Sequence, residues 1–295
     1  MAQNNLTPAA AGSVVAKRSE RSIGAILIDA GKLTPEDAER ILRLQREQGL
    51  RFGDAATKLG LITQADIEFV LSRQFDYPYL LRGQSVVSEY LVAAYAPFSP
   101  QVETLRALRS QLMVRWFDTN PARKALAIVS AARNEGRSFI AANLAVVFSQ
   151  LGEHTLLIDA DLRNPCQHKL FGLDNRAGLS AVLSGRGGPE AIQRIPALRD
   201  LSVLPAGALP PNPLELLARP LFLQLLQELA NEFDVIILDS PAAAEYADAQ
   251  TLAERAGAAL IVARTNATRI LQVRRVIEGL SQGSTTVVGT VLNEF

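Results

Sequence analysis

The sequence predicts an α/β protein with a mostly parallel sheet covered by helices on both faces, preceded by a small helical repeat domain. Three observations support this prediction. Short apolar runs alternate with helical patterns beyond residue 124, residues 125–166 have the order strand, loop, helix, strand, and residues 22–74 contain an internal repeat. Alternating strands and helices are typical of parallel sheets with both faces covered.

The stretch 125–166 is the centre of the predicted sheet. Its expected elements are a strand at Ala125–Ser130, a polar turn at Ala131–Arg137, a helix at Phe139–Leu151 and a strand at Thr155–Ile158. The helix would have one apolar face, made of Ile140, Leu144, Val147, Phe148 and Leu151. Parallel strands end at the same sheet edge, so the turn and the acidic residues after the second strand should meet there.

The polar turn partly fits the phosphate-loop pattern GxxxxGK[ST]. Gly136 and Ser138 match it, but Ala131 replaces the first glycine and Arg137 replaces the lysine. Loop amides and the N-terminal end of the next helix can bind phosphate, and a serine hydroxyl can bind Mg²⁺. A guanidinium keeps the charge but is a planar fork, so an ordinary cationic turn is an equal alternative for the loop taken alone.

Acidic strand ends favour the nucleotide site over the ordinary turn. The run Thr155–Ile158 is followed by Asp159 and Asp161, and a second apolar run within Asp234–Pro241 ends in Asp239. Sites for Mg-nucleotides place such carboxylates opposite the phosphate loop. Three separate elements therefore predict nucleotide binding.

Several motifs together resemble the bacterial tyrosine kinases. They are the loop and helix SAARNEGRSFIAANLA at 130–145, LLIDADLRNP at 156–165, AGALPPNPLELL at 206–217, GTVLN at 289–293, and the Glu-x-x-Arg-x-x-Arg pattern of Glu103, Arg106 and Arg109. The motifs cover about residues 99–293, and their joint occurrence is far more specific than any one of them.

The resemblance implies a P-loop NTPase domain over 101–295 that uses ATP and Mg²⁺ to phosphorylate protein tyrosine in exopolysaccharide synthesis, export and chain-length control. The implied ATP-binding residues are Asn134, Glu135, Gly136, Arg137, Ser138, Phe139 and, at the adenine, Asn293. The implied catalytic residues are Arg137, Asp159 and Asp161, with Asp159 as the better candidate for the tyrosine proton. The implied Mg²⁺ ligands are Ser138, Asp161 and Asp239.

The resemblance also implies partners. The family uses its Glu-x-x-Arg-x-x-Arg helix between subunits, so a homo-oligomer through Glu103, Arg106 and Arg109 is expected, although a solvated helix face is the alternative. An inner-membrane chain-length determinant, or polysaccharide co-polymerase, is the expected membrane partner. The expected location is the cytoplasm, peripheral to the inner membrane through that partner.

The N-terminal part predicts a disordered arm at 1–20 and a helical two-repeat domain at 21–80. Gly24 and Gly53, Gly31 and Gly60, and Thr34 and Thr63 all keep the same offset. This domain resembles the N-terminal domain of type II secretion and type IV pilus ATPases, some of which bind cyclic di-GMP through Arg-x-Gly repeats. Only Arg51-Phe52-Gly53 fits, because Arg21 stands one place too early, so a protein-docking module is favoured over cyclic di-GMP binding.

Residues 81–100 are predicted to link the two domains, since prolines bracket the apolar pieces of 76–100. The tyrosines of that stretch are Tyr77, Tyr79, Tyr90 and Tyr95. They are candidate phosphate acceptors, but a packing role against a neighbouring core is favoured.

Composition bounds the remaining functions. The 30 Lys and Arg residues balance 30 Asp and Glu residues, so no global field favours nucleic acid, and no nucleic-acid partner is expected. The single Cys166 excludes an internal disulfide and is expected to pack rather than react. No apolar run approaches 18 residues, so a membrane role would require a partner.

Two further functions compete with the kinase. One is a non-kinase ATPase or nucleotide-dependent scaffold of the partition and septum-positioning type, favoured because the chain stops at Asn293-Glu294-Phe295 without the terminal tyrosine cluster usual in the kinase family. The other is a pseudoenzyme adaptor, in which Ala131 and Arg137 mark lost chemistry. Sequence alone leaves all three open.

Overall fold

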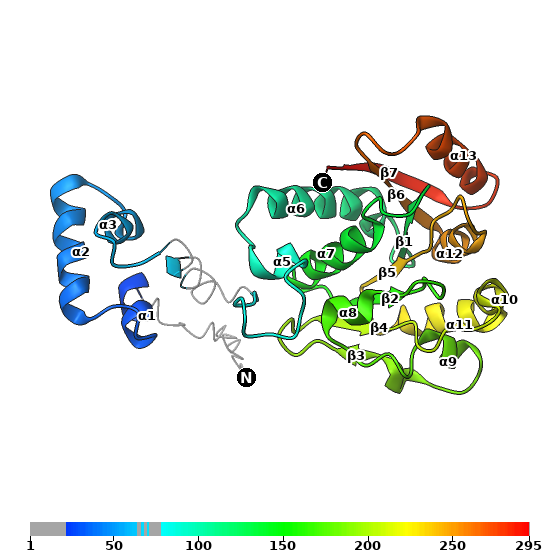
Figure 1. Cartoon of the computed structure of the whole chain (residues 1–295), viewed down its shortest axis with the longest axis horizontal. Coiled ribbons are helices and arrows are strands. Elements are labelled where there is room, and N and C mark those ends of the chain that lie inside the picture. Colours follow the sequence, from blue (N-terminus) through cyan, green and yellow to red (C-terminus); the bar gives the residue numbers. More distant parts are fainter. Residues whose placement is uncertain (1–21, 64–65, 68–69, 71–77, 295) are drawn as a thin grey trace, which may run out of the picture. The chain divides into compact units, whose positions relative to one another are not determined.

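The structure, a computed structural model, describes residues 22–63, 66–67, 70 and 78–294 (Figure 1). The predicted arm at 1–20 lies outside the described residues. The chain divides into two compact units, Met1–Tyr77 and Pro78–Phe295. None of the helices in the described ranges is both long and apolar enough to span a bilayer.

The first unit is helical, as predicted. Its helices are α1 (Ile23–Asp29), α2 (Pro35–Gln48) and α3 (Phe52–Lys58). Buried Leu27, Ile41, Ala55 and Ala56 form the middle of its core. An added methyl group on Gly24 would lie 3.2 Å from the Phe52 ring, so the small residue lets the two repeat units pack closely.

The two repeat units use the same helix-start chemistry. Thr34 caps α2 in a capping box, in which its hydroxyl accepts from the Asp37 amide and the Asp37 carboxylate accepts from the Thr34 amide. Thr63 and Asp66 repeat both bonds at 3.2 and 3.0 Å. The predicted repeat is confirmed at these positions.

The second unit is built on one seven-stranded sheet in the order β3-β4-β2-β5-β1-β6-β7. The strands are β1 (Ala125–Ser130), β2 (Thr155–Asp159), β3 (Gln193–Arg194), β4 (Leu201–Leu204), β5 (Val235–Asp239), β6 (Ala258–Arg264) and β7 (Thr286–Asn293). Every pairing is parallel except that of β3 with β4. The predicted mostly parallel sheet is therefore confirmed.

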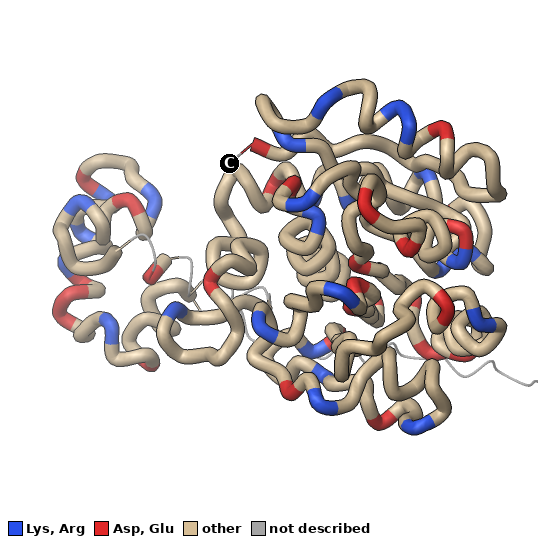
Figure 2. Tube along the Cα trace, turned by 45° about the vertical axis from the view of Figure 1, so that its right-hand side comes forward, with Lys and Arg blue, Asp and Glu red and all other residues tan. Residues whose placement is uncertain are grey.

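Helices cover both faces of this sheet, again as predicted (Figure 1). The helices of the second unit are α5 (Val92–Tyr95), α6 (Pro100–Arg115), α7 (Arg137–Ser149), α8 (Gln167–Phe171), α9 (Leu179–Leu183), α10 (Pro213–Ala218), α11 (Pro220–Leu229), α12 (Asp248–Ala256) and α13 (Ile270–Ser281), with 3-10 turns at Phe117–Thr119 and Pro189–Ala191. Leu126 and Ile128 of β1 face the core under α5, α6 and α7, and Ala127 and Val129 face the core under α10 to α13. Basic and acidic residues are interspersed along the chain (Figure 2).

Helix α7 differs from its prediction. It begins at Arg137 rather than Phe139, and every residue from Ile140 to Ser149 is buried. The predicted single apolar face was wrong because α7 packs against the sheet on one side and against α5 and α6 on the other. Leu151, assigned to that face, lies beyond the helix and is 50% exposed.

The segment predicted as a linker, residues 81–100, packs into the second unit instead. Leu91, Ala93 and Tyr95 are buried in its core, and the Tyr95 hydroxyl donates to the Val87 carbonyl at 2.5 Å. The Ser88 amide donates to the Leu170 carbonyl at 2.7 Å. Its prolines and short apolar runs are typical of a linker in sequence, but Ala93 and Ser88 are held by Asn143 and Leu170, which lie 50 and 82 positions away.

Asn143 holds this segment to α7. Its side chain is fully buried, accepts from the Ala93 amide at 2.9 Å, and donates to the carbonyls of Tyr90 and Phe139 at 3.3 and 3.0 Å. Buried polar groups are costly when they lose their partner. This one side chain therefore fixes the path of residues 90–93 over the helix.

We expect Asn143→Ala to destabilise the second unit by about 1–3 kcal/mol, because the Ala93 amide would be left buried without an acceptor. The measurement is urea unfolding followed by circular dichroism. The control is Asn231→Ala, on the surface, which should change the free energy of unfolding by less than about 0.5 kcal/mol. Equal effects of the two substitutions would contradict the assignment.

Candidate nucleotide site

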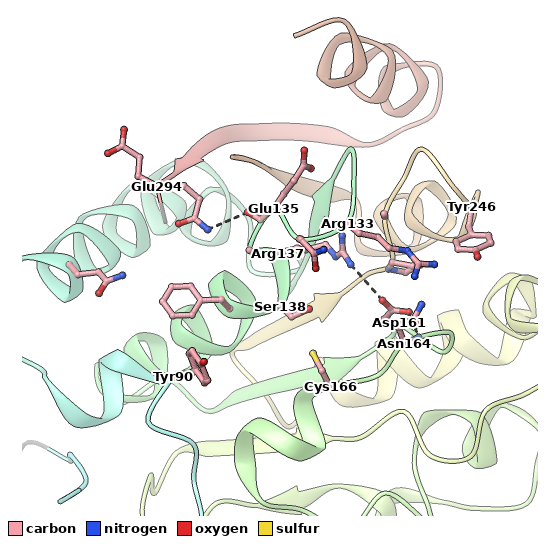
Figure 3. Close-up of a pocket in the computed structure, with 17 residues that line it drawn as sticks. Tyr90, Arg133, Glu135, Arg137, Ser138, Asp161, Asn164, Cys166, Tyr246 and Glu294 are labelled. Carbon is pink, nitrogen blue, oxygen red and sulfur yellow. Dashed lines mark hydrogen bonds and ion pairs between the residues drawn. The ribbon is translucent and has the colours of Figure 1, made fainter. Parts of the chain in front are cut away.

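A cavity of about 650 Å³ opens at the carboxyl edge of the sheet, where β1, β2 and β5 end (Figure 3). Its lining residues are Tyr90, Gln101, Arg133, Asn134, Glu135, Gly136, Arg137, Ser138, Phe139, Asp161, Asn164, Cys166, Pro241, Ala242, Tyr246, Asn293 and Glu294. Cavities of this size hold ligands of drug or cofactor size. Ligands of open α/β sheets bind at this edge.

The loop between β1 and α7 turns through two left-handed residues, Asn134 (φ 60°) and Gly136 (φ 88°). Ala131 is not among the positive-φ residues, so its methyl group in place of the first glycine causes no backbone strain. Gly136 is the N-cap of α7, and no side chain caps this end. The loop therefore directs free helix amides and the positive end of a 13-residue helix dipole at the cavity.

Glu135 anchors the loop from behind. It is 2% exposed, and its carboxylate accepts from the Ala132 amide at 2.8 Å and from the Thr268 hydroxyl. The Asn293 amide nitrogen donates to the Glu135 carbonyl at 3.2 Å (Figure 3). Glu135 and Asn293 thus shape the loop, and Asn293 joins β7 to the cavity wall.

Arg137 points inward between two acidic strand ends. Its Nη2 lies 3.6 Å from Asp161 Oδ2, its Nε lies 3.6 Å from Asp239 Oδ1, and its Nη1 donates to Ser130 Oγ at 2.5 Å. The residue is only 9% exposed. Its guanidinium therefore neutralises the carboxylates as well as bordering the cavity.

Asp159 and Asp239 lie side by side because their strands pair in parallel register. Both are fully buried. Burial raises the pKa of Asp159 well above its ordinary value, and the charge of Asp239 adds to the effect. Burial also raises the pKa of Asp239, although the Arg137 charge and hydrogen bonds from Gln167 and Ser138 oppose the shift.

The carboxylate set fits a divalent cation. One oxygen of Asp239 accepts from Gln167 Nε2 at 2.7 Å, while its Oδ1 is buried without a hydrogen-bond partner. Asp161 and Ser138 line the cavity, and Ser138 lowers the pKa of the neighbouring Asp239. A hard cation prefers such oxygen ligands, so Ser138, Asp161 and Asp239 are suited to hold Mg²⁺.

The structure brings most predicted site residues to one cavity. Asn134, Glu135, Gly136, Arg137, Ser138, Phe139, Asp161 and Asn293 line it. Asp159 and Asp239 stand behind its wall. Asp159 Oδ2 accepts from the amides of Cys166 and Gln167 at 3.0 and 2.9 Å, so this carboxylate fixes the turn that enters α8.

Sequence reasoning missed an arginine clamp at the rim. Arg163 Nε and Nη2 donate to the Asp248 carboxylate at 2.7 and 3.1 Å, and the guanidinium lies 3.8 Å from the Tyr246 ring centroid. Arg133 makes the equivalent pairing with Glu245 at 2.7 Å. These contacts join loops far apart in sequence, which no local pattern shows. The buried Gln167 was missed for the same reason.

The predicted oligomer residues are partly engaged within the chain. Arg106 pairs with Glu103 one helical turn away, and Arg109 Nη1 donates to the Val147 carbonyl at 2.8 Å. Arg109 thus ties α6 to α7, while Glu103 is exposed and Arg106 is mostly buried. In the first unit, Arg51 is the exposed N-cap of α3 and Arg21 lies outside the described residues, so the structure adds no support for cyclic di-GMP.

Fold and site together define a P-loop-type nucleotide-binding domain. Comparison with known proteins agrees: residues 124–283, more than half of the chain, match the family model described as "Cellulose biosynthesis protein BcsQ". The chain is also 36% identical over 203 residues to tyrosine-protein kinase YwqD of Bacillus subtilis, covering 69% of this chain and 85% of that protein.

The longer relative tyrosine-protein kinase wzc of Salmonella typhimurium is 31% identical over 205 residues, covering 70% of this chain and 28% of its own length. Among solved structures, the kinase domain of Escherichia coli tyrosine kinase ETK is 32% identical, with a TM-score of 0.65 over 69% of this chain and 79% of that one. The chain belongs to the family of the matching model and, with these relatives, to the bacterial tyrosine kinases. It spans less than a third of the length of the long relatives.

The reactivity of the Cys166 thiol provides a test of the electrostatics of the site that needs no ligand. Burial, with the negative charge of Asp239 as the next cause, raises the pKa of its thiol from 9.0 to about 12. At pH 8 only about one thiol in ten thousand would be thiolate, the reactive form. We expect iodoacetamide to alkylate the folded chain at least about 100-fold more slowly than the unfolded chain.

Mass spectrometry follows this reaction cleanly because Cys166 is the only cysteine. Guanidinium-unfolded protein at the same pH is the control. Raising the pH from 8 to 9.5 should speed alkylation of both forms, but the folded rate should keep rising where the unfolded rate levels off. Equal rates at pH 8 would show that the thiol is neither buried nor electrostatically suppressed.

Proposed function

We propose that this protein is an ATP- and Mg²⁺-dependent protein-tyrosine kinase that acts in exopolysaccharide synthesis, export and chain-length control. One observation carries the proposal: the free amides at the start of α7 and Asp161, which follows β2, line one cavity, and Asp239 at the end of β5 lies behind its wall beside Arg137. The relatives named as tyrosine-protein kinases support the reaction, and the family description of cellulose biosynthesis supports the polysaccharide setting.

The residues of the loop have distinct proposed roles. The amides of Asn134 to Ser138 bind the phosphates, and Phe139 adds apolar wall beside them. Asn293 borders the base, since it reaches the loop from the end of β7. When bound, Mg-ATP supplies the phosphoryl group, and positioning and charge neutralisation are the main contributions of a protein to its transfer.

The acidic residues divide the remaining work. Ser138, Asp161 and Asp239 would hold the metal, and Arg137 would neutralise charge on their side of the cavity. Asp159 was the predicted proton acceptor, but its burial and its bonds to two backbone amides support a positioning role for the turn at Cys166 and Gln167. Asp161, which lines the cavity, would act there through the metal.

The setting of the kinase is a further part of the proposal. The partner would be an inner-membrane chain-length determinant or polysaccharide co-polymerase, and the protein would work on the cytoplasmic side through that contact. Self-association would use α6, on which the exposed Glu103 pairs with the mostly buried Arg106. A surface pair contributes little to stability within one chain, but it can fix the orientation of two chains.

A non-kinase ATPase or nucleotide-dependent scaffold is the second candidate. Its supporting observation is Arg137, whose guanidinium is engaged with Asp161, Asp239 and Ser130. A cation that is already paired within the protein is less free to neutralise charge on a phosphoryl group during its transfer. The pairing of Arg137 therefore favours nucleotide binding without rapid phosphoryl transfer. The two candidates differ in where the phosphate goes, which one assay measures.

Asp161→Ala should weaken Mg-ADP binding at least about tenfold, which equals about 1.4 kcal/mol, because it removes a cavity carboxylate that fits the metal. Calorimetry measures the affinity. The same variant should form no phosphotyrosine from labelled ATP, on itself or on a Glu/Tyr copolymer. Asp174→Ala, a surface acid paired with Arg176, should behave as wild type.

Equal affinities of wild type and Asp161→Ala would refute the metal site. Phosphotyrosine made by wild type, together with released ADP, would support the kinase. Steady release of free phosphate with no phosphotyrosine on either acceptor would instead support the ATPase candidate.

Self-association provides a separate test. We expect light scattering to give a lower mass for Arg106→Glu than for wild type, because the substitution replaces the Arg106–Glu103 ion pair of α6 with two neighbouring acids. Arg109 is left intact since it holds α6 to α7. Arg186→Glu, an exposed change outside α6, is the control. Equal wild-type and Arg106→Glu masses at high concentration would exclude this helix as the interface.

A further inference from the structure

Gln167 is a fully buried polar residue that bridges two of the proposed metal ligands. It begins α8 directly after Cys166, which lines the cavity (Figure 3). Its Nε2 donates to Asp239 Oδ2 at 2.7 Å and to the Ser138 carbonyl at 3.2 Å. Both partner atoms are acceptors, so this end of the side-chain amide must be the nitrogen. One side chain therefore joins the end of β5 to the first turn of α7.

The backbone of Gln167 is fixed as well. Asp159 Oδ2 accepts from the Gln167 amide at 2.9 Å and from the Cys166 amide at 3.0 Å. Asp159 ends β2, in parallel register with Asp239 at the end of β5. Gln167 is thus held at its backbone by one strand end, and its side chain holds the next strand end.

The bond from Gln167 engages one oxygen of Asp239 and leaves the other near Arg137. Asp239 Oδ1 lies 3.6 Å from Arg137 Nε, which is within ion-pair distance but too long for a hydrogen bond. Within the described part of the chain, both atoms are buried without a hydrogen-bond partner. A shorter, charge-assisted contact between them would be favourable. Rotation of the carboxylate toward Arg137 would move Oδ2 away from Gln167, so the bond to Gln167 keeps the contact long.

We propose that Gln167 is a positioning residue for the divalent cation of this site. It holds Asp239 Oδ2 so that Oδ1 stays available to the metal rather than closing on Arg137, and it fixes the backbone that carries the Ser138 hydroxyl. This inference rests on the metal site of the proposed function and deepens it. Partners that orient metal ligands commonly change metal affinity by about 10- to 100-fold when they are substituted.

The test compares nucleotide binding with and without metal. Gln167→Met keeps the length of the side chain and removes its donor. We expect the affinity for Mg-ADP to fall at least about tenfold. The affinity for ADP in EDTA should change by less than about twofold, because the loop amides remain. Calorimetry measures both affinities, and electron paramagnetic resonance with Mn²⁺ and ADP should show less bound metal for the variant.

Gln150→Met is the matched control. Gln150 Nε2 also donates to two carbonyls, those of Pro78 and Ala93, each at 2.9 Å, and the residue does not line the cavity. Its substitution should leave both nucleotide affinities unchanged. Circular dichroism establishes that each variant is folded. If Gln167→Met does not fold, Gln167→Asn carries the same expectation, because it keeps an amide that is one methylene too short for the bridge.

The outcomes separate this inference from the proposed function. An unchanged Mg-ADP affinity in a folded Gln167 variant would overturn the positioning role and leave the metal site standing. Equal losses of ADP affinity with and without Mg²⁺ would also overturn it, since Gln167 would then only shape the loop. A wild-type affinity for ADP that does not depend on Mg²⁺ would overturn the metal site and this inference with it.

Discussion

The site depends on the burial of two neighbouring carboxylates beside one arginine. The parallel register of β2 and β5 sets Asp159 directly against Asp239, and both are inaccessible to water. Buried charge is costly unless it is paired and hydrogen-bonded, and two like charges raise that cost. Arg137, Gln167 and the amides at 166–167 supply the compensation. The interactions that compensate the two buried carboxylates therefore also hold the start of α7 and the turn into α8 in place.

This constraint follows from topology. Strand β1 lies between β5 and β6, so the loop after β1 opens beside the acidic end of β5, and β2 adds its acidic end from the next position. A central parallel strand must be apolar on both faces, which β1 satisfies by sending Leu126 and Ile128 to one core and Ala127 and Val129 to the other. The polar residues can then appear only where the strands stop, and they all stop at the same edge.

Much of this arrangement is readable from the sequence, because strand ends, glycine turns and acidic tips are local signals. The strands β1, β2 and β5, the loop through Gly136 and the pairing of the Thr34 and Thr63 caps are local features of that kind. The failures have a common cause. Residues 81–100, the clamp of Arg163 on Asp248, and Gln167 depend on partners 50 to 85 positions away or more. A periodic pattern likewise cannot tell a helix with one apolar face from α7, which is covered on all sides.

The contacts of Arg137 explain how the phosphate loop keeps its path although two of its residues depart from the usual pattern. An ammonium is a compact charge, whereas a guanidinium offers five donors in one plane and can face Ser130, Asp161 and Asp239 together. Ala131 needs no left-handed backbone, so the loop path survives its two departures from the usual pattern. As a consequence, Arg137 offers little unpaired positive charge to a ligand, because its guanidinium is paired with the carboxylates. In the proposed site, phosphate binding would then rest mainly on the amides of residues 134–138 and on the dipole of α7, neither of which depends on a lysine.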